Sequence, residues 1–242
     1  MGAQAHDVLI PGERCNPRFV APAWNGWGCA SIFVASFAIG MVLSRVIFSL
    51  FNVITPVTID LAVIGRDAAI IIVVFALRGL LRPTGPVVYD FLHPSSQSVA
   101  VGVAAGTVLF LISIGANSIE QHVLGGNQSF WRIPLQSHRV STLAMDLGRG
   151  VVATPIAEEL LFRGVLFRGL VQRMSLLCAT LISAALFSAV HVNLYLFAPL
   201  LAMGAGLALL YYWTRALWTS IIAHASINFI SIALTYAVDG TK

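Results

Sequence analysis

Long apolar runs, each close to the length that crosses a bilayer, constrain this chain more than any other feature of its sequence. A transmembrane helix needs about 20 predominantly apolar residues. Of the 242 residues, 58% are hydrophobic and 10% are charged, whereas ordinary soluble domains carry about a quarter charged residues. We therefore expect an all-α, polytopic transmembrane helical bundle of about seven (six to eight) spans. The runs lie at residues 29–51, 57–77, 99–119, 140–162, 175–191, 194–213 and 217–238.

The runs divide the chain into three predicted parts. Residues 1–28 form a polar N-terminal segment, residues 29–139 hold the N-terminal transmembrane helices and their linkers, and residues 140–238 hold the helices that carry the chemistry. The number of spans is open in residues 53–98, where charges and then several prolines interrupt the apolar pattern. Residues 99–119 are rich in glycine and alanine, which predicts close packing on a neighbouring helix.

The basic residues indicate membrane lipid as a partner and no nucleic acid. The formal net charge is +4, and thirteen Arg and one Lys are scattered singly between the apolar runs. Nucleic-acid binding would cluster them on one face, whereas loops that face anionic lipid would not. More of them lie on the inner side when the N-terminus is cytoplasmic, so the positive-inside rule predicts that orientation. The preference for Arg over Lys indicates a high-GC bacterium, and hence an integral protein of the bacterial plasma membrane.

Residues 155–164 place two adjacent carboxylates and an arginine in an otherwise apolar run. Ionised side chains at bilayer depth cost several kcal/mol, so they indicate a functional site. On a helix, positions i and i+4 share a face, so we expect Glu159 to pair with Arg163. Glu158 points about 100° away, which leaves it free for chemistry. Pro155 lies one turn earlier and removes a backbone hydrogen bond, freeing polar backbone near the acids.

Five further charged residues are expected to be pairing or interface residues: Asp60, Arg66, Asp67, Asp146 and Arg149. Three of them fall in the second apolar run. Either that helix begins late, near Ala68, or its charges pair inside the bundle, and we expect a mixture of the two.

Two later spans bring polar side chains to the same membrane face. His191 ends one apolar run with Phe187 one helical turn before it, and His224 and Asn228 are spaced i, i+4 on another. A carboxylate and a histidine can share proton transfer to and from water. A second histidine and an amide can donate to the oxyanion of a scissile carbonyl. The set therefore fits peptide hydrolysis by activated water, with zinc held by Glu158, His191 and His224 as the alternative.

Three motifs in this order resemble the CPBP intramembrane proteases. They are Glu158-Glu159-x-x-x-Arg163, Phe187-x-x-x-His191 and His224-x-x-x-Asn228. That family includes the type II CAAX prenyl endopeptidases and the bacteriocin-processing and immunity proteins of the Abi family. The resemblance covers roughly residues 140–235.

The resemblance implies a CAAX prenyl endopeptidase-like hydrolase that cleaves a membrane-anchored or lipidated peptide or protein. Glu158 and His191 would activate water, and His224 and Asn228 would form the oxyanion site. The supporting residues would be Glu159, Arg163 and Phe187. Members of the family are labelled metalloproteases, yet the resemblance to the prenyl proteases implies a metal-independent glutamate protease. The standard zinc spacing HExxH does not occur in the chain.

Two other classes of function stay open from the sequence. One is a non-catalytic membrane protein that binds a peptide or confers bacteriocin immunity through the same cavity. The other is a small proton-coupled transporter with Glu158 as its proton site.

Overall fold

Seven helical runs make up the part of the chain that the structure describes. The structure is a computed structural model, and it describes residues 26–51, 55–81, 94–130 and 140–239. The expected all-α bundle is confirmed. Six of the runs are single helices: α1 (Gly26–Leu50), α2 (Pro56–Leu81), α4 (Ser96–Leu124), α8 (Leu176–Ala189), α9 (Phe197–Thr214) and α10 (Leu217–Asp239).

The seventh run, here called the central helix, is continuous from Val140 to Leu170. It alternates between α and π geometry in five segments: α5 (Val140–Leu147), η1 (Gly148–Ala153), α6 (Thr154–Glu159), η2 (Leu160–Phe167) and α7 (Arg168–Leu170). The helix therefore has the wider π geometry over two of its five segments, whereas the sequence predicts a plain α-helix.

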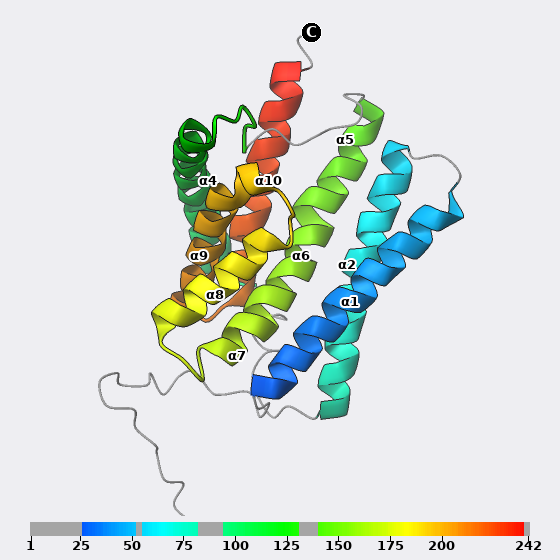
Figure 1. The fold of residues 1–242 in the computed structure, drawn as a ribbon, viewed down its shortest axis with the longest axis vertical. Coiled ribbons are helices and arrows are strands. Elements are labelled where there is room, and N and C mark those ends of the chain that lie inside the picture. Colours follow the sequence, from blue (N-terminus) through cyan, green and yellow to red (C-terminus); the bar gives the residue numbers. More distant parts are fainter. Residues whose placement is uncertain (1–25, 52–54, 82–93, 131–139, 240–242) are drawn as a thin grey trace, which may run out of the picture.

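The central helix runs between two groups of helices (Figure 1). The antiparallel pair α1 and α2 lies on one side, and α4, α8, α9 and α10 lie on the other. Within the second group α4 packs on α9 and α10, and α8 packs on α9. Segment α6 contacts both α2 and α10, so residues from both halves of the chain reach it.

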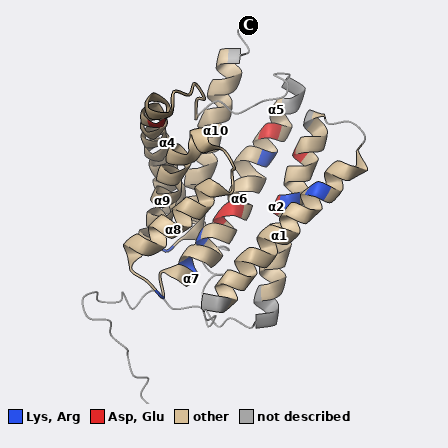
Figure 2. Cartoon of the chain, viewed as in Figure 1, with Lys and Arg blue, Asp and Glu red and all other residues tan. Residues whose placement is uncertain are grey.

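Four described helices are long and apolar enough to cross a membrane: Gly28–Leu50, Ser96–Leu124, Leu194–Thr214 and Leu217–Val238. Helix α8 is apolar but has only 14 residues. The chain is an integral membrane protein, and its polar helices α2 and the central helix lie side by side within the bundle (Figure 2).

The charges of α2 pair inside the bundle, which confirms one of the two expectations for this region and overturns a late helix start. Arg149 Nε lies 2.7 Å from Asp60 Oδ1, and its Nη2 lies 3.5 Å from Asp146 Oδ1. Arg66 Nη2 lies 2.7 Å from Asp67 Oδ1. The helix can begin at Pro56 because each acid within it has a cation to offset its charge.

The central helix extends beyond its expected end at residue 162. It continues to Leu170, so Arg163 and Arg168 are buried in the bundle and are not loop residues. A carboxylate one turn earlier on the helix neutralises Arg163, which permits this depth. Both arginines therefore drop out of the positive-inside comparison, and the cytoplasmic N-terminus stays a prediction.

Glycines of α4 let α10 approach closely, as the Gly- and Ala-rich composition predicts. A Cβ atom on Gly102 would lie 2.8 Å from Ile222 Cβ, and one on Gly106 would lie 2.5 Å from the Ala223 carbonyl oxygen. Because α10 carries His224 and Asn228, this contact also sets the position of two predicted site residues.

We predict that Gly106→Val destabilises the protein by about 1–3 kcal/mol, because the added side chain must push α10 away. Gly115→Val on the same helix is the matched control, since a Cβ there meets nothing within 4 Å. Thermal unfolding in detergent measures both variants. Equal melting temperatures for the two would contradict a close α4–α10 contact.

Candidate active site

A cavity of about 230 Å³ collects the four predicted catalytic residues. Glu158 comes from α6, His191 from the turn after α8, and His224 and Asn228 from α10. The remaining lining includes Phe130, Thr154, Phe187, Asn193, Leu196, Leu200, Met203 and Ser231. The cavity therefore has polar lining from the central helix and α10, and apolar lining to which α9 contributes Leu200 and Met203.

Beneath the cavity lies the predicted pair of Glu159 and Arg163. Arg163 Nη1 donates to Glu159 Oε1 at 2.7 Å, and both side chains are fully buried. An unpaired charge at this depth would be strongly unfavourable, because burial removes its hydration. The i, i+4 pairing persists although η2 has π geometry.

Two further contacts hold the Arg163 guanidinium in place. Its Nη2 donates to the Gly204 carbonyl oxygen at 3.0 Å, and its Cζ lies 4.8 Å from the centre of the Phe187 ring. Gly204 also lets α9 pack closely on α8, since a Cβ there would lie 3.1 Å from the Ala184 Cα. Phe187 thus joins the arginine to the histidines, whose rings lie 5.0 Å (His191) and 6.0 Å (His224) from its own.

His224 is oriented by the same carboxylate. Its Nδ1 lies 2.9 Å from Glu159 Oε1, and the side chain is almost fully buried. A carboxylate oxygen accepts hydrogen bonds, so Nδ1 carries the hydrogen. The other ring nitrogen, Nε2, is left for a ligand in the cavity.

His191 is held in the same way by backbone. It follows the end of α8, and its Nδ1 lies 2.7 Å from the Phe187 carbonyl oxygen. Because a carbonyl only accepts, Nδ1 carries the hydrogen and Nε2 of the neutral ring is a lone-pair acceptor. The next residue, Val192, has a φ of 51°, which a β-branched residue rarely adopts. The turn that presents His191 is therefore conformationally strained.

Asn228 bonds to a backbone oxygen that Pro155 leaves without a helical partner. In the π geometry of η1 the Thr154 N–H donates to the Arg149 carbonyl oxygen, so the next donor in register would be residue 155, bonding to Gly150. Proline has no N–H, and Asn228 Nδ2 instead donates to the Gly150 oxygen at 2.7 Å. One of the two amide hydrogens stays available to the cavity.

Glu158 has a partner that its own helix does not supply. Its carboxylate is buried, and Oε1 lies 3.5 Å from Arg66 Nη2 of α2. The sequence identifies Arg66 as a pairing residue but gives no means of joining it to Glu158, because the two are far apart in the chain.

Sequence reasoning missed several lining residues that spacing alone can find. Thr154 lies one turn before Glu158, and Ser231 lies seven residues after His224, so each shares a helical face with a predicted site residue. Phe130 and Asn193 lie in segments outside the long helices, where no periodic pattern identifies them.

The zinc alternative would use Glu158, His191 and His224 as ligands. Within the described ranges no group of three or more His, Cys, Asp or Glu side chains lies close enough together to hold an ion. The histidine Nδ1 atoms are bonded to Phe187 and Glu159, so a metal would be bound through Nε2.

Comparison with known families agrees with the three motifs. Residues 140–230 match the family model described as type II CAAX prenyl endopeptidase Rce1-like. This match supports the resemblance of the segment to the CAAX proteases. The matched segment spans the central helix, α8, α9 and most of α10, and it includes all seven residues that the sequence identifies. No curated protein and no solved structure matches the chain. The family assignment supports a membrane protease as the general function.

We predict that Arg163→Met lowers the free energy of unfolding by about 3–5 kcal/mol, because it removes the arginine cation from the buried Glu159 carboxylate and leaves only the contact with His224. Glu159→Gln/Arg163→Met removes both charges and should regain part of that loss. Denaturant unfolding in mixed micelles gives the comparison. A double variant less stable than the single one would contradict a role for Arg163 in neutralising Glu159.

Proposed function

We propose that the protein is an intramembrane endopeptidase that hydrolyses a peptide bond with water activated by Glu158 and His191. One observation carries this proposal: a single cavity contains a carboxylate, two histidines and an amide. Both histidines are bonded through Nδ1, so each offers Nε2 to the same space. The match of residues 140–230 to the CAAX prenyl endopeptidase model supports the reaction class.

In the proposed reaction Glu158 and His191 take a proton from water as its oxygen attacks the scissile carbonyl carbon. The carbonyl oxygen becomes an oxyanion and accepts hydrogen bonds from His224 Nε2–H and the free amide hydrogen of Asn228. His224 acts in this step as an imidazolium, and Glu159 is its counter-ion. The proton taken from water then passes to the leaving nitrogen as the C–N bond breaks.

The proposed substrate is a membrane-anchored or lipidated peptide or protein. The cavity is smaller than the 300–1,000 Å³ of ordinary small-molecule sites, so it suits a short piece of extended peptide around one bond. Its apolar side, including Leu200 and Met203, suits apolar side chains next to that bond. We place the enzyme in a bacterial plasma membrane with a cytoplasmic N-terminus, among lipids, with residues 140–238 as the catalytic part.

The proposed reaction uses no metal. Its proton transfers and oxyanion contacts are all assigned to side chains that line the cavity. The zinc alternative differs in one measurable respect, which is the response to a strong chelator.

We predict that Glu158→Gln abolishes cleavage of a quenched fluorescent lipidated peptide by the purified, detergent-solubilised protein, while melting temperature is retained. The amide keeps the shape of the side chain but cannot accept the proton. Glu120→Gln is the control: Glu120 Oε1 accepts a hydrogen bond from the Ala198 N–H outside the cavity lining, so activity should be unchanged. Wild-type cleavage should survive the chelator.

Three other outcomes would change the assignment. Chelator-sensitive cleavage that zinc restores would move Glu158 and the histidines to a metal-ligand role. An unaffected phenotype with Glu158→Gln would favour a peptide-binding or immunity protein. Flux that depends on pH without any cleaved product would favour a transporter.

We predict that Asn228→Ala lowers kcat by about 10²–10³, the cost of losing one oxyanion donor. The variant also leaves the Gly150 carbonyl oxygen without its partner. Pro155→Ala/Asn228→Ala separates the two effects, because alanine restores an N–H beside that oxygen. Kinetics of the double variant should stay as slow as those of Asn228→Ala. Recovery of kcat would assign Asn228 to the backbone contact alone.

A further inference from the structure

Glu158 meets a cation that lies outside the family-matched segment. Arg66 is on α2, and its Nη2 lies 3.5 Å from Glu158 Oε1. Among the described residues no other Lys or Arg lies within ion-pair distance of this carboxylate, because Arg163 is turned toward Glu159. The N-terminal half of the chain therefore supplies a charge to the proposed catalytic acid.

Arg66 is itself held in position by a clamp between α2 and the central helix. Its Nε and Nη2 approach Asp67 Oδ1 at 2.8 and 2.7 Å. The other oxygen of this fully buried carboxylate accepts a hydrogen bond from Thr154 Oγ1 at 2.7 Å. Thr154 lies one turn before Glu158 on the central helix and lines the same cavity. The guanidinium is thus fixed relative to Glu158 from both helices.

Arg66 is the cation for Glu158 as well as for Asp67. Segment α6 packs against α2, α10, η1 and η2, and His191 shares its cavity. The charged and titratable groups on α6 and these elements near the cavity are Asp60, Arg66, Asp67, Arg149, Glu159, Arg163, His191 and His224. Arg149 pairs with Asp60, and Arg163 with Glu159. Without Arg66, the neighbouring carboxylates of Asp67 and Glu158 would both lose the cation that now lies close to each of them.

We propose that Arg66 is a positioning residue for Glu158, which keeps the carboxylate ionised and directed into the cavity so that it can accept a proton from water. Asp67 and Thr154 fix the guanidinium for this purpose. An opposite charge within about 4–6 Å favours the ionised form of a carboxylate, and a like charge disfavours it. The catalytic part of this inference rests on the proposed function, whereas the charge contact between Arg66 and Glu158 does not.

The test uses the full-length protein in detergent at one neutral pH and a hydrophobic carbodiimide, which reacts with protonated carboxyl groups. Mass spectrometry of the digested protein locates the label. In the wild type we expect slow labelling of Glu158. In Arg66→Gln we expect labelling to be about tenfold faster or more, the change in protonated fraction that a nearby charge produces. Arg66→Lys retains the charge and should label slowly.

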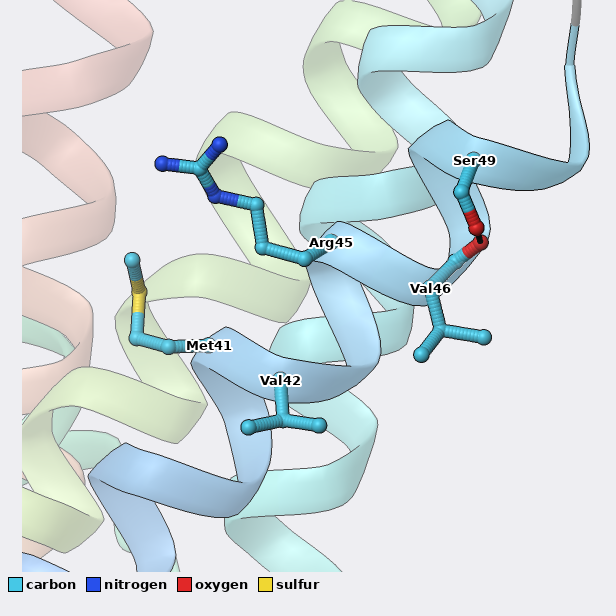
Figure 3. Close-up of a pocket in the computed structure, with 5 residues that line it drawn as sticks. All are labelled: Met41, Val42, Arg45, Val46 and Ser49. Carbon is cyan, nitrogen blue, oxygen red and sulfur yellow. Dashed lines mark hydrogen bonds between the residues drawn. The ribbon is translucent and has the colours of Figure 1, made fainter.

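A matched arginine on α1 provides the control. Arg45 lies beside Met41, Val42, Val46 and Ser49 (Figure 3), which line a separate pocket of about 410 Å³ on α1 alone. Among the described residues Arg45 makes no ion pair. Arg45→Gln should therefore label like the wild type. Faster labelling of Asp67 and not of Glu158 in Arg66→Gln would overturn the proposal, because Arg66 would then serve Asp67 only.

A second variant covers the case in which Arg66→Gln fails to fold. Arg66→Gln/Asp67→Asn replaces the ion pair by neutral groups of similar size. Labelling of Glu158 faster than in the wild type is expected, by a smaller factor than in Arg66→Gln, because the like charge of Asp67 is removed as well. Slow labelling in this folded variant would overturn the proposal.

Steady-state kinetics of the same variants test whether Arg66 affects catalysis as well as labelling. If the wild type cleaves the peptide, Arg66→Gln should lower kcat with KM unchanged, and Arg66→Lys should restore kcat. A wild type that cleaves nothing would count against the proposed function. The labelling result would still decide whether Arg66 controls the charge of Glu158.

Discussion

The buried contact between Arg163 and Glu159 is the interaction on which the rest of the site depends. Charges at this depth are tolerated only as a pair with further hydrogen bonds, and each partner here has a second contact. Glu159 also orients His224, and Arg163 also meets the Gly204 carbonyl and the Phe187 ring. One ion pair thus joins the central helix to α8, α9 and α10. Because this ion pair is fixed, the residues that contact it, including His224 and Phe187, are held in position.

The same cost of burying charge explains why α2 accompanies the family-matched segment. Arg66 and Asp67 on α2 meet Glu158 and Thr154, and Asp60 meets Arg149. On the central helix, Arg163 is taken up by Glu159, so the cation that meets Glu158 comes from α2, and Arg149 meets an acid of α2 as well. A second polar helix beside it completes the pairing, so the N-terminal half contributes to the electrostatics of the cavity as well as to packing.

Much of the site can be predicted from the sequence because it depends on short spacings. Glu159 and Arg163 at i, i+4, and His224 and Asn228 at i, i+4, each lie on one helix, where geometry follows directly from separation. The contact of Arg66 with Glu158 joins two helices, so it does not follow from spacing along the chain. It depends on how α2 rotates against α6, which is decided by packing over the whole bundle. Two features of local geometry were also missed: the π segments, and the end of α8 before His191.

The π segments on either side of α6 affect the direction in which the side chains of the central helix point. A π turn closes with i→i+5 bonds and so contains one more residue than an α turn. In a regular α-helix, one extra residue would instead rotate all the following side chains by about 100° around the axis. Glu158, Glu159 and Arg163 are therefore aimed by the number of residues as well as by their identity. A chain lacking one residue of η1 could keep all three motifs intact and still turn its carboxylates toward lipid.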